Sequence, residues 1–178
     1  MSQDEEINEV KKLRSAVLND PRNAELRYLL AAEMAQAQDY EGAVLEFSAA
    51  IALNPMLHVA RLQLGLLHLT LAQTHHTIAV LAPLEDLGDD EPLKYFKRGL
   101  EALIKDEFET CIVNLTHGIE LNRSNTPLNG DMQLIIDKVA ALLSERKAQA
   151  AEPASEQLAS SDPVVRTDFS LYNETTKH

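Results

Sequence analysis

The stretch from Tyr40 to Pro55, YEGAVLEFSAAIALNP, decides the fold because its pattern returns twice at a constant interval. The matching stretches are THHTIAVLAPLEDLGD, which begins at Thr74, and FETCIVNLTHGIELNR, which begins at Phe108, so the period is 34 residues without a gap. A fixed period of this length indicates a repeat protein in which each unit is one supersecondary element. The repeated columns are Ala43, Thr77 and Cys111; Phe47, Leu81 and Leu115; Ala50, Leu84 and Gly118; and Leu53, Leu87 and Leu121.

Apolar residues recur at steps of three and four throughout the first 148 residues, which predicts helices and no strands. One helix is expected before Asn19-Asp20-Pro21, and a last one begins at Thr126-Pro127 and ends near Lys147. Pro83 lies inside a predicted helix, where its missing N–H predicts a kink. The paired helices between these ends are expected over 24–37 and 40–53, 58–71 and 74–87, and 92–105 and 108–121.

These repeats resemble the tetratricopeptide repeat family, whose 34-residue unit is a helix-turn-helix with small, aromatic and proline positions. The first repeat carries the closest match, at Leu30-Ala31, Met34, Tyr40, Ala43, Phe47, Ala50 and Pro55. The resemblance implies an all-α fold, a right-handed superhelical stack of antiparallel helix pairs (an α-solenoid). Small residues at Ala31, Gly65 and Gly99 are expected to let the two helices of a pair lie close together.

The same resemblance divides the chain into successive segments. Residues 1–22 are expected to form an N-terminal half repeat, and residues 23–125 three full repeats (24–57, 58–91 and 92–125). Residues 126–148 are expected to form a capping helix. Beyond them, the composition of residues 149–178 predicts a flexible tail, in which Phe169, Leu171 and Tyr172 form a candidate docking motif.

In this family the first helix of each pair lines a concave groove, and the resemblance indicates which columns face it. Spacings of four and three residues place the three groove positions of each helix on one face. An apolar groove of this size predicts a covering: a peptide or helical segment of a partner, a second copy of the chain, or the tail. The alternative to a binding groove is that some of the residues in these columns pack between neighbouring helices. The predicted groove residues are Tyr28, Leu62 and Phe96; Ala32, Leu66 and Leu100; and Ala35, Leu69 and Leu103.

The charged residues near these columns do not match a known variant of the family. Relatives that hold the carboxyl end of heat-shock chaperones use Lys, Asn and Arg in the groove columns, and this sequence has none there. A carboxylate clamp is therefore not expected. The cations on adjacent turns could bind an acidic rim, but they are expected to be solvated; they are Arg61, Lys94, Lys97 and Arg98.

Composition and motifs exclude several classes of function. The net charge of −12 disfavours nucleic acid and anionic membrane surfaces as partners. The acidic N-terminal residues and the lack of a long apolar run predict no signal peptide and no membrane insertion, and hence a soluble, cytoplasmic protein. Cys111 is expected to be a packed thiol, and His75-His76 lacks metal-ligand spacing. No catalytic residue, metal or cofactor is predicted, so the chain is not expected to be an enzyme.

Two functions are favoured after these exclusions, and a structural subunit that assembles through its own ends ranks below both because the last helix is charged. The first is a non-enzymatic protein-interaction adaptor that binds a peptide or helical segment of a partner in the apolar groove. The alternative is a cytoplasmic chaperone for a secretion-system substrate, because chaperones of type III translocators resemble this chain in being small, acidic stacks of three such repeats. A homodimer and a self-bound tail both stay open. Only fold-level analogy supports the chaperone.

Overall fold

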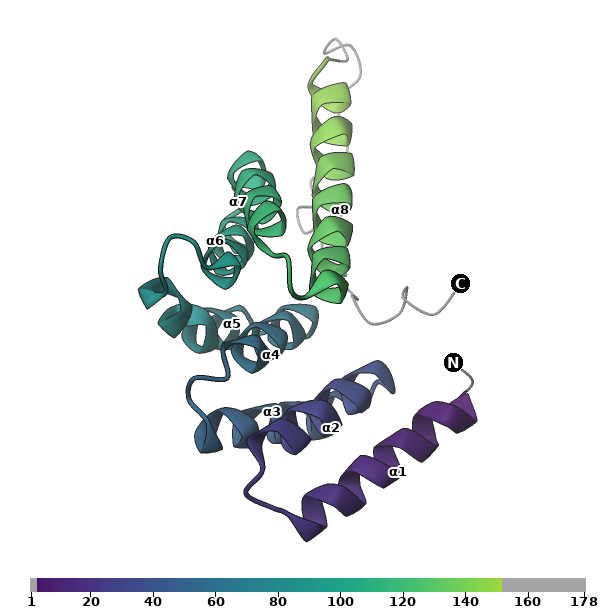
Figure 1. Cartoon of the computed structure of the whole chain (residues 1–178). Coiled ribbons are helices and arrows are strands. Elements are labelled where there is room, and N and C mark those ends of the chain that lie inside the picture. Colours follow the sequence, from purple (N-terminus) through teal and green to yellow (C-terminus); the bar gives the residue numbers. More distant parts are fainter. Residues whose placement is uncertain (1–2, 152–178) are drawn as a thin grey trace. The chain divides into compact units, whose positions relative to one another are not determined.

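The structure, a computed structural model, describes the backbone of residues 3–151 and the side chains of residues 7–149, and all regular structure in this part is helical (Figure 1). This confirms the all-α expectation. The helix α8 ends at Ala151, slightly beyond the predicted boundary at 148, and the predicted docking motif at Phe169, Leu171 and Tyr172 lies outside the described residues. The elements are α1 (Gln3–Asn19), α2 (Ala24–Gln36), α3 (Tyr40–Leu53), α4 (His58–Thr70), α5 (Thr74–Leu81), the 3₁₀ helix η1 (Ala82–Asp86), α6 (Pro92–Ile104), α7 (Phe108–Leu121) and α8 (Thr126–Ala151).

The helices form two compact units. The first unit holds α1 to η1, and the second begins at Asp89 and holds α6 to α8. In the first unit α1 packs on α2, α2 on α3, α3 on α4 and α4 on α5, and α2 also contacts α4. In the second unit α6 packs on α7 and α7 on α8. Packing between sequential neighbours is the arrangement expected of stacked helix pairs, because each repeat contacts only the repeats next to it.

The turn inside each helix pair has the same backbone conformation in all three repeats. Gln38, Ala72 and Asp106 stand one period apart and have φ values of 63°, 56° and 59°, in the left-handed region. The next residue then donates its N–H to a carbonyl inside the preceding helix, which closes a Schellman motif at the helix end. These hydrogen bonds run from Asp39 to Met34 (2.8 Å), from Gln73 to His68 (2.8 Å) and from Glu107 to Ala102 (2.9 Å).

Close approach of paired helices depends on two glycines. A Cβ atom on Gly65 would lie 2.6 Å from Cδ2 of Leu81, and a Cβ atom on Gly99 would meet Cδ2 of Leu115. Real Cβ atoms keep a greater distance than this, so a larger residue at either position would force the facing leucine to shift, and glycine lets α4 and α5, and α6 and α7, pack as they do. The expectation for Gly65 and Gly99 agrees with this geometry.

Pro83 changes the helix type in the first unit. The α-helix α5 ends at Leu81, and the chain continues as the 3₁₀ helix η1, which contains Pro83 near its start. Proline cannot donate the backbone hydrogen bond that an α-helix needs there, so the predicted kink takes the form of a tighter turn. No helix in the described part is both long enough and apolar enough to cross a membrane.

Candidate functional site

The structure buries most of the predicted groove residues. In the first unit they lie on α2 and α4, which contact each other, and in the second unit they lie on α6. Tyr28, Ala32 and Leu69 are partly exposed. The buried ones are Ala35, Leu62, Leu66, Phe96, Leu100 and Leu103.

Tyr28 and Phe96 pack against neighbouring helices. The ring of Tyr28 lies 6.0 Å from the ring of Phe47, measured between centroids, and Tyr28 packs against the core of the first unit. The ring of Phe96 lies against Gly118, where an added Cβ atom would be 2.5 Å from it. Both contacts join neighbouring helices, which is the alternative that the sequence left open. Binding of a partner by these nine residues stays a prediction, and its accessible part is Tyr28, Ala32 and Leu69.

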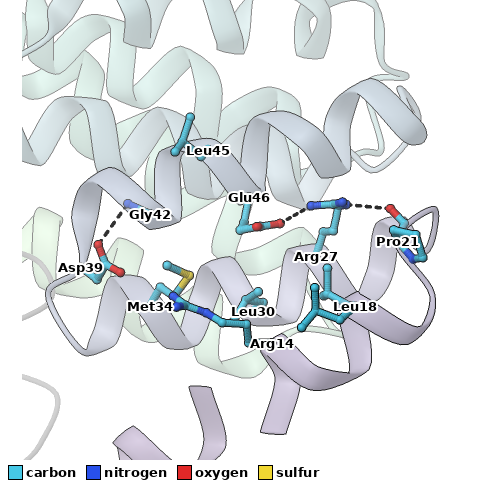
Figure 2. Close-up of a pocket in the computed structure, with 11 residues that line it drawn as sticks. Arg14, Leu18, Pro21, Arg27, Leu30, Met34, Asp39, Gly42, Leu45 and Glu46 are labelled. Atoms are coloured by element: carbon cyan, nitrogen blue, oxygen red, sulfur yellow. Dashed lines mark hydrogen bonds and ion pairs between the residues drawn. The ribbon is translucent and has the colours of Figure 1, made fainter. Parts of the chain in front are cut away.

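A pocket of about 620 Å³ opens elsewhere in the first unit, between α1, α2 and α3 (Figure 2). Its α2 residues are Arg27, Leu30 and Met34, and helical geometry places them opposite Tyr28, Ala32 and Ala35. Each helix contributes residues three or four positions apart, and the adjoining turns complete the lining. The full lining is Arg14, Val17, Leu18, Pro21, Arg27, Leu30, Met34, Asp39, Gly42, Leu45 and Glu46.

The pocket has a buried apolar floor and an exposed apolar rim. Leu30 and Met34 on α2 are 1% and 4% exposed, whereas Leu18 on α1 and Leu45 on α3 are 77% and 70% exposed. The difference arises because α2 packs against both α1 and α3, which leaves the outer sides of those two helices in solvent. Large apolar side chains left in solvent beside an apolar pocket are typical of a binding surface. We call this site, defined by the lining above, the α1–α3 pocket.

Most charges of the α1–α3 pocket are neutralised locally. Nη1 of Arg27 lies 2.6 Å from Oε2 of Glu46, and Nε of Arg27 donates to the carbonyl of Pro21 at 3.0 Å (Figure 2). Oδ1 of Asp39 accepts the backbone N–H of Gly42 at 3.1 Å, at the N-terminus of α3, where the helix dipole also favours a negative charge. These contacts connect α2 to α3 and to the turn after α1.

Arg14 differs from the other charged residues of the pocket. It lies on α1 one turn before Leu18, is exposed, and takes part in no ion pair with a described residue. Arg27 and Glu46 form an ion pair and Asp39 accepts a hydrogen bond from a backbone amide, so Arg14 is the cation of the lining that has no ion-pair partner among the described residues. The site therefore combines an apolar surface with one guanidinium, that of Arg14, that forms no ion pair with a described residue.

Sequence reasoning missed the α1–α3 pocket, although two residues signal it. Leu18 stands next to the apolar stripe of α1, and Leu45 falls outside the repeated columns of α3. Apolar residues outside the packing pattern point to the solvent side of a helix. Their position on two helices that flank a third can be recognised only once the helices are placed.

Two lysines are buried, contrary to the expectation of solvated charges at Lys94 and Lys97. Lys94 and Lys97 are 9% and 7% exposed; Nζ of Lys94 lies 2.8 Å from Oδ1 of Asp89, and Nζ of Lys97 lies 3.0 Å from Oε2 of Glu101. The prediction was wrong because the aliphatic part of a lysine can pack against apolar neighbours while its ammonium group pairs with a carboxylate.

The buried thiol and the buried imidazole of the described part are held by packing and by local contacts. Cys111 is buried, and burial raises the pKa of its thiol to about 12, so the thiol stays protonated and is a poor nucleophile. His68 pairs through Nδ1 with Oε1 of Gln73 at 2.7 Å and stacks on His76, and burial lowers the pKa of His68. Residues 7–149 hold no group of three or more His, Cys, Asp or Glu side chains suited to a metal ion.

Comparison with known proteins identifies the fold. No family model matches the sequence, and no curated protein matches it. Several solved structures do, among them a MamA RS-1 double mutant and residues 41 to the end of MamA from Desulfovibrio magneticus RS-1. Each has 17% sequence identity and a TM-score of 0.54, and the alignments cover 83% and 84% of this chain and 88% of each MamA chain. MamA is a tetratricopeptide repeat protein, so the chain has the tetratricopeptide repeat fold.

Proposed function

We propose that this protein is a non-enzymatic scaffold that binds a segment of a partner protein in the α1–α3 pocket. The observation that carries the proposal is the exposure of Leu18 and Leu45 on either side of the buried Leu30 and Met34. Full burial of one leucine side chain contributes about 1.5–3 kcal/mol, so a partner that covered both rim residues would gain a large part of a micromolar binding energy.

The shape of the pocket favours a helical or short extended segment. Its residues follow one side of α1, α2 and α3 at steps of three and four, and its volume of about 620 Å³ is enough for several side chains. Amphipathic helices bind grooves of this kind with apolar anchors one turn apart. We therefore expect two or three apolar anchors in the partner segment.

The groove predicted from the repeat columns is a second candidate surface. Its accessible residues are Tyr28, Ala32 and Leu69, which lie away from the α1–α3 pocket. Because helical geometry places Tyr28 and Leu30 on opposite sides of α2, substitutions can affect one surface without the other.

The secretion-chaperone hypothesis is a narrower form of the same activity. It requires the bound segment to belong to a secreted substrate and the protein to act in the cytoplasm. Both statements stay predictions, and the identity of the bound partner tests them.

Co-purification from the native cell with matched variants of the full chain tests the proposal. Leu18→Ser/Leu45→Ser alters the pocket rim, Tyr28→Ala/Leu69→Ala alters the predicted groove, and Val113→Ser is the control, since Val113 on α7 is 67% exposed. We expect Leu18→Ser/Leu45→Ser to lose a partner that the control retains. If only Tyr28→Ala/Leu69→Ala loses the partner, the binding site is the predicted groove. A partner list unaffected by either double variant would reject both surfaces.

A further inference from the structure

We infer that the chain's own segment Asp168-Phe169-Ser170-Leu171-Tyr172 docks in the α1–α3 pocket, so that a partner segment must displace it. This inference rests on the pocket proposed above as a protein-binding site. The docked segment would occupy the pocket and so limit the binding of a partner there.

The pocket selects for apolar anchors beside a negative charge. Leu18, Leu45, Leu30 and Met34 provide the apolar surface. Arg14, on the same side of α1 as Leu18, provides a guanidinium without an ion-pair partner among the described residues. A carboxylate next to apolar anchors would satisfy this guanidinium with a charge-assisted hydrogen bond.

The segment has the matching chemistry. Phe169 and Tyr172 are the only aromatic residues of the sequence after 149, Leu171 stands between them, and Asp168 directly precedes them. Buried aromatic side chains are the most effective anchors of protein interfaces. The other apolar run after an acidic residue in 152–178, Pro163-Val164-Val165 after Asp162, has smaller side chains and no aromatic ring.

A long stretch of chain precedes the segment. The helix α8 ends at Ala151, and residues 152–168 precede Phe169. A chain of this length spans up to about 60 Å when extended, at roughly 3.3–3.6 Å per residue. The segment can therefore reach a surface well away from the end of α8.

Binding of a labelled peptide to the full chain tests the inference. The probe is a fluorescent synthetic peptide of residues 163–178, measured by anisotropy against wild type and against a tail variant, Phe169→Ser/Leu171→Ser/Tyr172→Ser. We expect the tail variant to bind the peptide at least about tenfold more tightly than wild type, because a tethered segment competes at a high effective concentration. Addition of Leu18→Ser/Leu45→Ser to the tail variant should weaken binding about tenfold or more, while addition of Val113→Ser should not, since each factor of ten corresponds to 1.4 kcal/mol.

A charge exchange separates direct contact from loss of structure. Arg14→Glu in the tail variant should weaken binding of the wild-type peptide and strengthen binding of a peptide that carries Asp168→Arg. A folding defect would weaken both peptides alike, so rescue by the exchanged peptide supports contact between the two positions.

Several results would overturn the inference. The first is that the peptide does not bind the tail variant, and the second is that it binds the tail variant equally well with Leu18→Ser/Leu45→Ser or with Val113→Ser added. The third is that the wild type forms an oligomer in sedimentation and the tail variant does not. That result would place the segment in the pocket of a second copy. If the peptide fails to bind while partner binding still depends on Leu18 and Leu45, the inference falls and the proposed function stands. If partner binding is also independent of the rim, the pocket itself is rejected.

Discussion

Gly99 on α6 lies directly against Leu115 on α7, and no space remains between them for a methyl group. The same relationship joins Gly65 to Leu81 one period earlier. The repeat therefore preserves a point of helix contact as well as a sequence pattern. At this point the side chain of one helix packs on the backbone of the other, which brings the two axes close together.

Replacement of Gly99 by alanine is expected to destabilise the second unit. The new methyl group would displace Leu115 and would lie 3.3 Å from the carbonyl oxygen of Cys111, which belongs to the backbone and cannot easily move. Overpacking of this kind costs about 1–3 kcal/mol. Urea unfolding followed by circular dichroism measures the change in the free energy of unfolding.

Gly130 provides the matched control for this substitution. It lies on α8, and an added Cβ atom would meet nothing within 4 Å. Gly130→Ala should therefore stabilise the helix by about 0.5–1 kcal/mol through helix propensity alone. Since the same propensity gain applies to Gly99 inside α6, an equal change in stability for Gly99→Ala and Gly130→Ala would show that α6 and α7 are less closely packed than the structure indicates.

Replacement of Ala72 by glycine is expected to stabilise the first unit. Ala72 has φ 56°, a left-handed conformation that costs a residue with a Cβ atom about 1 kcal/mol relative to glycine. Ala72→Gly removes this strain at the end of α4 and should raise the free energy of unfolding by about 0.5–1 kcal/mol. Ala79→Gly, at an exposed position inside α5, should have the opposite effect, about 1 kcal/mol of destabilisation. A lower unfolding midpoint for Ala72→Gly would contradict the assigned turn.

The helices could be predicted closely from the sequence, but the turns between paired helices could not. The 34-residue period fixed the start of α3, α5 and α7, because the same columns must pack in every repeat. The left-handed residues at these turns are Gln38, Ala72 and Asp106, and none is the glycine that usually marks such a position. Their conformation follows from the close packing of the helix pair, which overrides local preference.

The candidate site shows a different limit of sequence reasoning. The columns correctly place Leu62 and Leu100 on one face of their helices, yet both are fully buried. A helix inside a stack has neighbours on several sides, so the direction of a side chain does not determine its exposure. The α1–α3 pocket depends on the spacing of three helices, and Leu18 and Leu45 alone could have suggested it.

Removal of the Asn122 side chain is expected to loosen the junction of α7 and α8. Asn122 is 6% exposed; its Nδ2 donates to the carbonyl of Asn125 at 2.9 Å and to Oδ1 of Asn129 at 2.7 Å, and its Oδ1 accepts the N–H of Asn125 at 3.2 Å. Asn122→Ala leaves these partly buried groups without partners, at a cost on the order of 2 kcal/mol. Arg123→Ala, at the exposed neighbouring position, is the control and should change the unfolding midpoint little. Similar midpoints for the two variants would contradict the role of this network.

Asp131 is expected to make the stability of the second unit depend on pH. It is partly buried on α8, one turn from the buried Leu128 and Ile135, and burial raises the pKa of its carboxyl to about 6. This pKa is higher in the folded state than its ordinary value of 3.8. Between pH 3.8 and about 6, the folded chain therefore binds the proton more tightly than the unfolded chain does. The contribution of the protonated carboxyl to stability is complete below pH 3.8 and is lost as the pH rises through about 6.

Asp131→Asn should therefore stabilise the protein at neutral pH and have little effect in acid. At pH 7 we expect a gain on the order of 1–2 kcal/mol, below the full value of the shift because the side chain is only partly buried, at 1.36 kcal/mol per pKa unit. The gain should shrink towards zero near pH 4, where the folded wild type already carries the proton. Urea titrations at both pH values measure this difference, with Asp137→Asn, at an exposed position of α8, as the control. A gain that is equal at the two pH values would show that the amide acts through packing, because removal of a buried negative charge can stabilise the helix only where the wild-type carboxyl is ionised.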